Sequence, residues 1–145
     1  MMRSPCVIAA AGLLLVSFPA FAGDATGLTA TSLLDTKTLG DGLPLRYPPG
    51  DAHLTALMVE LAPGGETGLH RHPMPVVGYI VSGEVTVSAE GMAPRVFKAG
   101  EAFVETSVWH NGRNEGREPV RILAIYLGAE GQLRVEKKQG SDGHY

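Results

Sequence analysis

The chain has 145 residues, of which 12 are basic and 15 are acidic, and its formal net charge is −3 at pH 7. The basic residues form no cluster beyond Lys137 and Lys138, which argues against nucleic acid as a partner. The 19 glycines and 10 prolines are dispersed and form no repeat, a composition that suits many short strands joined by turns. The length corresponds to a single domain.

Residues 1–22 have the pattern of a secretory signal peptide. Arg3 gives a positive start, residues 6–16 form an apolar core, and an Ala-Phe-Ala cleavage site ends at Ala22. The apolar core is shorter than the roughly 20 residues of a membrane-spanning helix, and a retained membrane anchor is the alternative. We therefore expect a periplasmic or secreted protein without membrane contact after the signal peptide is removed.

Processing at this site decides what the mature domain contains. Removal of 22 of the 145 residues leaves 123, and the loss of Arg3 changes the net charge from −3 to −4. The single cysteine, Cys6, is removed with the signal peptide. The mature domain therefore has no disulfide and no thiolate ligand for a metal.

Residues 23–50 are predicted to form an N-terminal arm and an edge strand. The segment 24–35 is mostly small and polar, and such an arm either pairs with a neighbouring subunit or frays as a free terminus. Residues 43–50 contain Pro44, Pro48 and Pro49, and prolines are confined to edge strands and strand ends.

Further strands are predicted at 54–61, in a hairpin over 76–88, at 95–98 and at 120–127. In the first of these, alternation places Leu57, Val59 and Leu61 inward. The last is apolar on both faces, as expected of a strand covered on both sides in a sandwich that also dimerises. Together with the arm, this strand predicts a homodimer. Residues 129–145 are predicted to be a polar C-terminal tail.

Three histidines have the spacing of a metal site. In an extended strand His70 and His72 project from the same face, about 7 Å apart, and Arg71 faces the other way. Pro73 favours extended geometry at His72. Two imidazoles on one face can chelate a borderline metal such as zinc, iron, copper or nickel, whereas the alternative is a pair of surface histidines. His110 follows a later turn and supplies a third imidazole.

Other residues near these histidines have structural interpretations. Trp109 alternates with His110 and should pack away from the site. Asn114 is expected to hold its own loop through backbone hydrogen bonds. His53 and His144 are expected to be solvated and not to bind metal.

The order of these residues resembles the cupin superfamily. The first cupin motif is Gly, five residues, His-x-His, three or four residues, Glu, six residues and Gly. The second is Gly, five residues, Pro-x-Gly, two residues, His, three residues and Asn, and the spacing from Gly to His varies among cupins. The matching residues here are Gly64, His70, His72 and Gly83 for the first motif, and Gly100, His110 and Asn114 for the second. The resemblance covers roughly residues 54–127 and places a cupin domain at 51–128. It implies an all-β fold, an antiparallel jelly-roll barrel with the three histidines at its mouth.

One position departs from the cupin pattern. Counting back from Gly83 places Val76 where the family has its glutamate ligand, and valine cannot bind metal. A replacement is available at Glu105, which shares a strand face with Phe103 and points into the barrel if Phe103 does. A buried carboxylate is costly unless it is paired or bound to a metal. The alternative is that Glu105 lies at a strand end and faces solvent.

The resemblance implies a divalent metal ion, with iron, manganese, nickel, zinc and copper all represented in the family. The first hypothesis is a metal-dependent enzyme, dioxygenase-like or isomerase-like, acting on a small organic molecule. The second is a non-catalytic module that binds a small ligand or a metal, and the third is a structural domain with vestigial histidines. The predicted metal ligands are His70, His72, His110 and Glu105, and no residue is assigned a catalytic role. Serine-hydrolase, Walker and dinucleotide-binding motifs do not occur.

Overall fold

The computed structural model describes residues 27–138, so the predicted signal peptide and His144 lie outside the described residues. Within this range the chain forms nine β-strands, and none of it is a helix that could cross a membrane. The strands are β1 (Ala52–Leu61), β2 (His70–Arg71), β3 (Val76–Ser82), β4 (Glu84–Ala89), β5 (Arg95–Lys98), β6 (Ala102–Val104), β7 (His110–Arg113), β8 (Val120–Ala129) and β9 (Glu136–Lys137). The strands belong to a compact unit that starts at Thr31.

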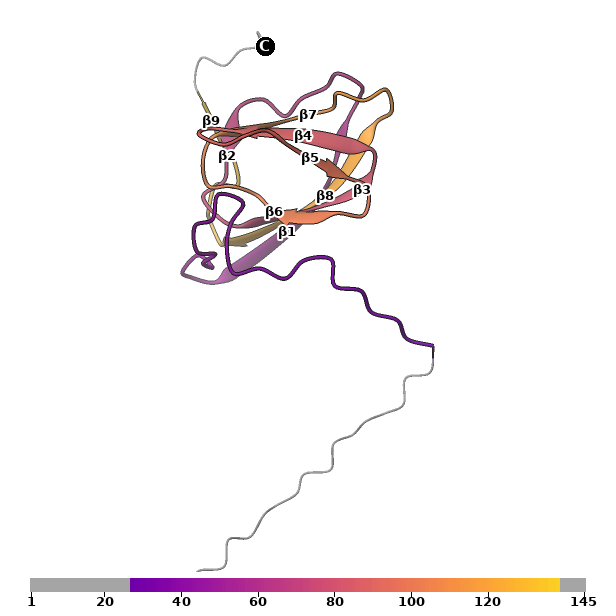
Figure 1. The fold of residues 1–145 in the computed structure, drawn as a ribbon. Helices are drawn as coiled ribbons and strands as arrows, with labels where there is room; N and C mark the ends of the chain where they lie inside the picture. The colour runs from indigo at the N-terminus through magenta and orange to yellow at the C-terminus, as the bar shows by residue number, and fades with distance from the viewer. Residues whose placement is uncertain (1–26, 139–145) are drawn as a thin grey trace, which may run out of the picture. The chain divides into compact units, whose positions relative to one another are not determined.

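The strands form two antiparallel sheets that face each other (Figure 1). One sheet has the order β1-β8-β3-β6 and the other has the order β5-β4-β7-β2-β9. Neighbours in both sheets are mostly distant in sequence, as in a jelly roll, where the chain passes repeatedly between the two sheets. The predicted all-β antiparallel fold is confirmed.

The core lies between the sheets in two clusters of buried residues, and the smaller one, with Val76 and Tyr126, adjoins His72. Ile80 and Val120 are fully buried, and the rings of Phe97 and Phe103 stack with centroids 3.9 Å apart. Gly78 makes room for this stack, because a Cβ at that position would lie 2.5 Å from the ring of Phe103. These inward-facing residues follow the period-two alternation of each strand.

Strand β1 extends the predicted strand by two residues at its start and lies at the edge of its sheet. Leu61 is buried and Val59 is half-buried, as predicted. Leu57 is on the same face but is 40% exposed, because β1 has a neighbour on one side only. Leu57 therefore has the predicted inward direction but is not buried.

Asn114 holds its loop, as expected from the sequence. Its side-chain amide donates to the carbonyls of Leu61 and Glu118 at 2.9 and 2.8 Å, and its side-chain oxygen accepts from the amide of Gly116 at 2.9 Å. The residue is fully buried, so these bonds replace water that it cannot reach. They fix the loop between β7 and β8 against the end of β1.

No strand forms at residues 43–50, where an edge strand was predicted. A single bridge joins Thr38 to Pro44, and the chain turns between them. This turn is bound to the segment after β6: the amide of Gly40 donates to the carbonyl of Glu105, and Ser107 donates through its amide and hydroxyl to Asp41 at 2.7 and 2.6 Å. Residues 36–43 therefore form a strap, a name we keep below, across the mouth of the barrel.

Part of the segment predicted to be a polar tail belongs to the sheet. Strand β9 pairs with β2, and Arg71 of β2 forms an ion pair with Glu136 of β9 at 2.7 Å. Residues as far as Lys138 therefore help to fix the strand that contains His70.

Candidate metal centre

The three histidines come from two adjacent strands of one sheet. His70 lies in β2 directly opposite His110 of β7, and His72 follows β2. Their rings lie within 4.4 to 5.4 Å of one another, measured between centroids. Arg71 faces the other way and packs over the ring of Trp109 at 4.7 Å, so Trp109 packs away from the site as predicted.

Each imidazole is fixed by a hydrogen bond from Nδ1 to a backbone carbonyl. The acceptors are the carbonyls of Gly68 for His70 at 2.8 Å, Arg134 for His72 at 2.7 Å, and Val108 for His110 at 2.8 Å. A carbonyl only accepts, so Nδ1 bears the proton in all three rings and each Nε2 is left to bind another group. Metal-binding histidines usually donate their other ring N–H to a carbonyl or carboxylate in this way, which fixes the ring orientation.

A left-handed glycine contributes to this arrangement. Gly68 has φ of +74°, a conformation that side-chain-bearing residues adopt only with strain. It turns the chain directly before β2 while its carbonyl accepts the hydrogen bond from His70 two residues later.

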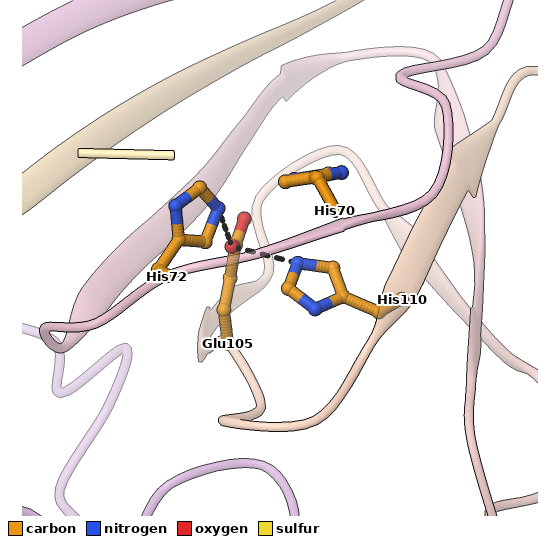
Figure 2. Close-up of side chains that lie close together, drawn as sticks. All are labelled: His70, His72, Glu105 and His110. Atoms are coloured by element: carbon orange, nitrogen blue, oxygen red, sulfur yellow. Dashed lines mark hydrogen bonds and ion pairs between the residues drawn. The ribbon is translucent and has the colours of Figure 1, made fainter. Parts of the chain in front are cut away.

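Glu105 enters the cluster from the segment after β6, on the sheet opposite the histidines. Its Oε2 lies 2.8 Å from Nε2 of His72 and 3.2 Å from Nε2 of His110 (Figure 2). Its backbone amide donates to the carbonyl of Val76 at 2.9 Å. The carboxylate therefore reaches the site from the position next to Val76, on the neighbouring strand of the same sheet.

The contact between His72 and Glu105 needs a proton or a metal ion between the two groups. Nδ1 of His72 donates to a carbonyl, and Nε2 of the same ring lies 2.8 Å from a carboxylate oxygen of Glu105. Two acceptors this close repel each other unless a proton, on Nε2 or on the carboxyl group, or a metal ion lies between them. The geometry is thus compatible with a metal site.

The electrostatics of the cluster favour an ionised carboxylate. Burial would raise the pKa of Glu105, but the hydrogen bonds and charges of His110 and His72 lower it to about 2. Burial has the opposite effect on a histidine and would lower the pKa of His110, but the hydrogen bond and charge of Glu105 raise this pKa above its ordinary value. Burial lowers the pKa of His70, which keeps that ring neutral and its Nε2 free to bind.

The four side chains fit a divalent metal. One ligand atom from each of His70, His72, Glu105 and His110 lies within 4.8 Å of the other three. A set of imidazole nitrogens and one carboxylate suits zinc, iron, copper, nickel and manganese at bond lengths of about 2.0 to 2.2 Å. His53 is exposed at the start of β1 and takes no part in the cluster.

Comparison with known proteins agrees with this geometry. The family model of the cupin domain matches residues 57–126, which include all four residues of the cluster. Residues 57–126 are thus similar to a cupin domain. No curated protein matches the chain in sequence.

Solved cupin structures resemble this one over part of their length. The oxalate decarboxylase of Lactobacillus farciminis, in a formate complex, is 28% identical, with a TM-score of 0.51 over 58% of this chain and 26% of its own. The DMSP lyase DddQ of Ruegeria pomeroyi is 22% identical, with a TM-score of 0.53 over 73% of this chain and 51% of its own. A Klebsiella pneumoniae protein with a double-stranded β-helix domain is 18% identical, with a TM-score of 0.52 over 66% of this chain and 85% of its own. The chain therefore spans a quarter to a half of the two enzymes, and the two lower identities indicate a shared fold alone.

The cluster lies in the wall of a cavity of about 390 Å³ inside the cupin barrel. This volume is within the usual range for small-molecule sites. Aliphatic side chains of both sheets form much of the lining, among them Val59, Val85, Val87, Ile122 and Ala124. The strap closes part of the mouth. A second cavity, of about 350 Å³, also reaches His72 and Glu105.

Two functional candidates in this cavity were not predicted from the sequence. Tyr126 is buried on β8 with its ring 5.4 Å from that of His72, and burial together with the charge of Glu105 raises its pKa. Arg95 on β5 also lines the cavity. Tyr126 is two residues from Ala124 and Arg95 is two residues from Phe97, and both of these neighbours face inward. Side chains two residues apart on a strand share a face, and this spacing could have identified both candidates.

Proposed function

We propose that this cupin is a metal-dependent enzyme that acts on a small organic molecule inside its barrel. The observation that supports this most strongly is the common orientation of the three imidazoles. Each has Nδ1–H tied to a separate carbonyl, and the Nε2 atoms of His72 and His110 are in contact with Glu105. Rings that only filled space would not need three backbone anchors and a shared carboxylate.

The proposed roles follow from the contacts. His70, His72, His110 and Glu105 would hold a divalent iron, manganese, nickel, zinc or copper ion, which supplies Lewis-acid or redox chemistry when bound. The aliphatic lining excludes water around the substrate, which strengthens polar interactions in the cavity. Tyr126 has a raised pKa and therefore stays protonated at neutral pH, where its hydroxyl can donate to a bound ligand.

A dioxygenase-like or isomerase-like reaction is the form of catalysis we propose. A dioxygenase-like reaction depends mainly on the metal and on a substrate that binds it, so it needs few other acid–base groups. An isomerase-like reaction would also need a group that moves a proton. Outside the metal cluster, Tyr126 and Arg95 are the only ionisable side chains among the lining residues of the main cavity. The same scarcity favours the second candidate, a non-catalytic module that holds a metal or a small ligand.

Turnover separates these two functions. The protein is loaded with each candidate metal in turn and incubated aerobically with an excess of small organic acids, enols and phenols. If the protein is an enzyme, at least one metal should yield many product molecules per chain, and the His72→Ala variant should yield no product. Ligands that bind to the loaded protein, but are recovered unchanged after long incubation, would establish the binding module instead.

We also propose that the protein forms a homodimer through the outer face of the β1-β8-β3 sheet. The outward-facing residues of these strands are largely apolar: Leu54, Met58, Val77, Tyr79, Val81, Leu123, Ile125 and Leu127. Leu54 is 63% exposed and Met58 is 49% exposed in the single chain. An apolar face that extends across three strands is typical of a protein–protein interface, and a second copy has a matching surface.

Ile125 lies in the middle row of this face, between Ala56 of β1 and Val77 of β3. Ile125→Glu should therefore convert a dimer into a folded monomer at tens of micromolar protein, because it places charge in the centre of the interface. Val96→Glu is the matched control, since Val96 is 45% exposed on the other sheet. Light scattering that gives a monomer for the wild type, or an unchanged dimer for Ile125→Glu, would contradict the proposal.

We propose that the protein is exported and cleaved after Ala22, on the sequence pattern of residues 1–22. Expression with the native N-terminus in a bacterial host should yield a periplasmic product whose intact mass corresponds to residues 23–145. A full-length chain recovered from the membrane or the cytoplasm would contradict this proposal.

A further inference from the structure

Arg95 is a cation on the inner face of a barrel strand. In an antiparallel pair, residues opposite each other project from the same face of the sheet. Arg95 lies opposite Val87, and Phe97, two residues further along β5, lies opposite Val85. Val85, Val87 and Phe97 all line the cavity. The alternation of side chains along β5 thus directs Arg95 towards the cavity, although the residue remains exposed.

Within residues 27–138, Arg95 has no carboxylate partner. Its guanidinium packs over the ring of Phe97 at 4.6 Å from the centroid, which orients the group without neutralising its charge. Arg95 is exposed, so its charge remains accessible to a ligand that enters the cavity. Arg95 is also the only arginine or lysine in the lining of this cavity.

The strand register gives the separation of Arg95 from the metal cluster. Val87 pairs with Gly112 of β7, and His110 lies two residues before Gly112. Arg95 therefore lies two strands from β7, and it is offset from His110 by two residues in the direction of the strands. With about 4.8 Å between strands and about 3.4 Å per residue, its Cα lies about 12 Å from that of His110. The aliphatic side chains of Val87 and Ala89 lie between them.

We propose that the cavity takes an amphipathic carboxylic acid, with a metal-binding group at the His70–His72–His110–Glu105 cluster, an apolar body along β4, and its carboxylate on Arg95. This inference rests on the proposed function and specifies its substrate class. A guanidinium binds a carboxylate through two parallel hydrogen bonds, which gives both affinity and orientation. A ligand with an apolar middle and two polar ends matches the order of groups along the cavity wall.

A matched pair of catechols tests this proposal by binding and not by turnover. The protein is loaded with zinc, which has no redox chemistry and so leaves a catechol intact. Calorimetry then compares 3-(3,4-dihydroxyphenyl)propanoate with 4-ethylcatechol, which has the same metal-binding head and no carboxylate. We expect the wild type to bind the carboxylate probe about tenfold more tightly, the value for a charge-assisted bond at a partly exposed site. This preference should weaken as salt concentration rises.

In Arg95→Gln the preference should fall to less than about twofold, while affinity for 4-ethylcatechol stays unchanged. Arg95→Lys, which keeps the charge, should retain part of the preference and covers the case in which Arg95→Gln folds poorly. Arg113→Gln is the matched control, because Arg113 is exposed on the same sheet and next to the inward-facing Gly112. It should keep the full preference.

The outcomes distinguish this inference from the proposed function. A wild type that binds zinc but prefers neither catechol, or binds neither, overturns the carboxylate inference and leaves the metal site intact. An Arg95→Gln variant that keeps the tenfold preference overturns it as well. Failure to bind zinc at the cluster overturns the proposed function itself.

Discussion

His72→Ala should abolish stoichiometric metal binding, reducing one ion per chain to a few per cent under conditions that saturate the wild type. The His72 side chain is only 2% exposed, its Nδ1 is fixed by Arg134, and its Nε2 lies 2.8 Å from Glu105. Loss of a group that merely orients a ligand typically lowers metal affinity 10- to 100-fold, so loss of a ligand should lower it by more than about 100-fold. Metal content is measured by mass spectrometry after dialysis.

The other two imidazoles should behave in the same way. His70→Ala and His110→Ala are expected to lose the metal, whereas His53→Ala, on an exposed position of β1, should keep one ion per chain. Thermal unfolding of each variant without metal checks that the barrel is intact. An equal loss of metal from His53→Ala would place the site elsewhere.

Glu105→Gln should lower metal affinity by about 100-fold and abolish any metal-dependent turnover. The change keeps the size of the side chain and removes the one negative charge of the cluster. The neutral amide is also a poor ligand for a borderline divalent metal. Glu84→Gln is the matched control, because Glu84 is exposed and pairs weakly with Lys98 at 3.9 Å. Metal occupancy of Glu105→Gln equal to that of the wild type would favour the non-catalytic module.

The metal-free protein offers a second readout of Glu105. Contacts with His110 and His72 lower its pKa in the folded state from about 4.5 to about 2 despite its burial. A carboxylate whose folded pKa is depressed stabilises the fold above its unfolded pKa. That stability is lost as the pH falls from about 4.5 towards 2. Denaturant titrations should show this loss in the wild type and a smaller one in Glu105→Gln.

Local rules were enough to predict the His70–His72 pair and the inward direction of Glu105, whereas the resemblance to cupins was needed to add His110. The i, i+2 spacing of His70 and His72 required only an extended backbone, and Pro73 favoured one. Glu105 is two residues after Phe103, and side chains two residues apart on a strand point the same way. This spacing placed Glu105 inside the barrel with Phe103. These features depend on a few neighbouring residues, so the sequence determines them directly.

Contacts between distant segments could not be predicted in this way. His72 is anchored by Arg134, 62 residues away, in a segment that looked like a polar tail. Asp41 is bound to Ser107, 66 residues away, and this pairing creates the strap where an edge strand was expected. Leu57 has an inward-facing position but lies on an edge strand, a fact that depends on the order of strands in the sheet. Each of these depends on the packing of the whole barrel.

Anomalous diffraction from crystals of the metal-loaded protein tests the central claim most directly. The account predicts one peak per chain, at about 2.0 to 2.2 Å from Nε2 of His70, His72 and His110 and from a carboxylate oxygen of Glu105. A chain without a peak at this cluster under saturating metal, or with its peak at other residues, would contradict the account.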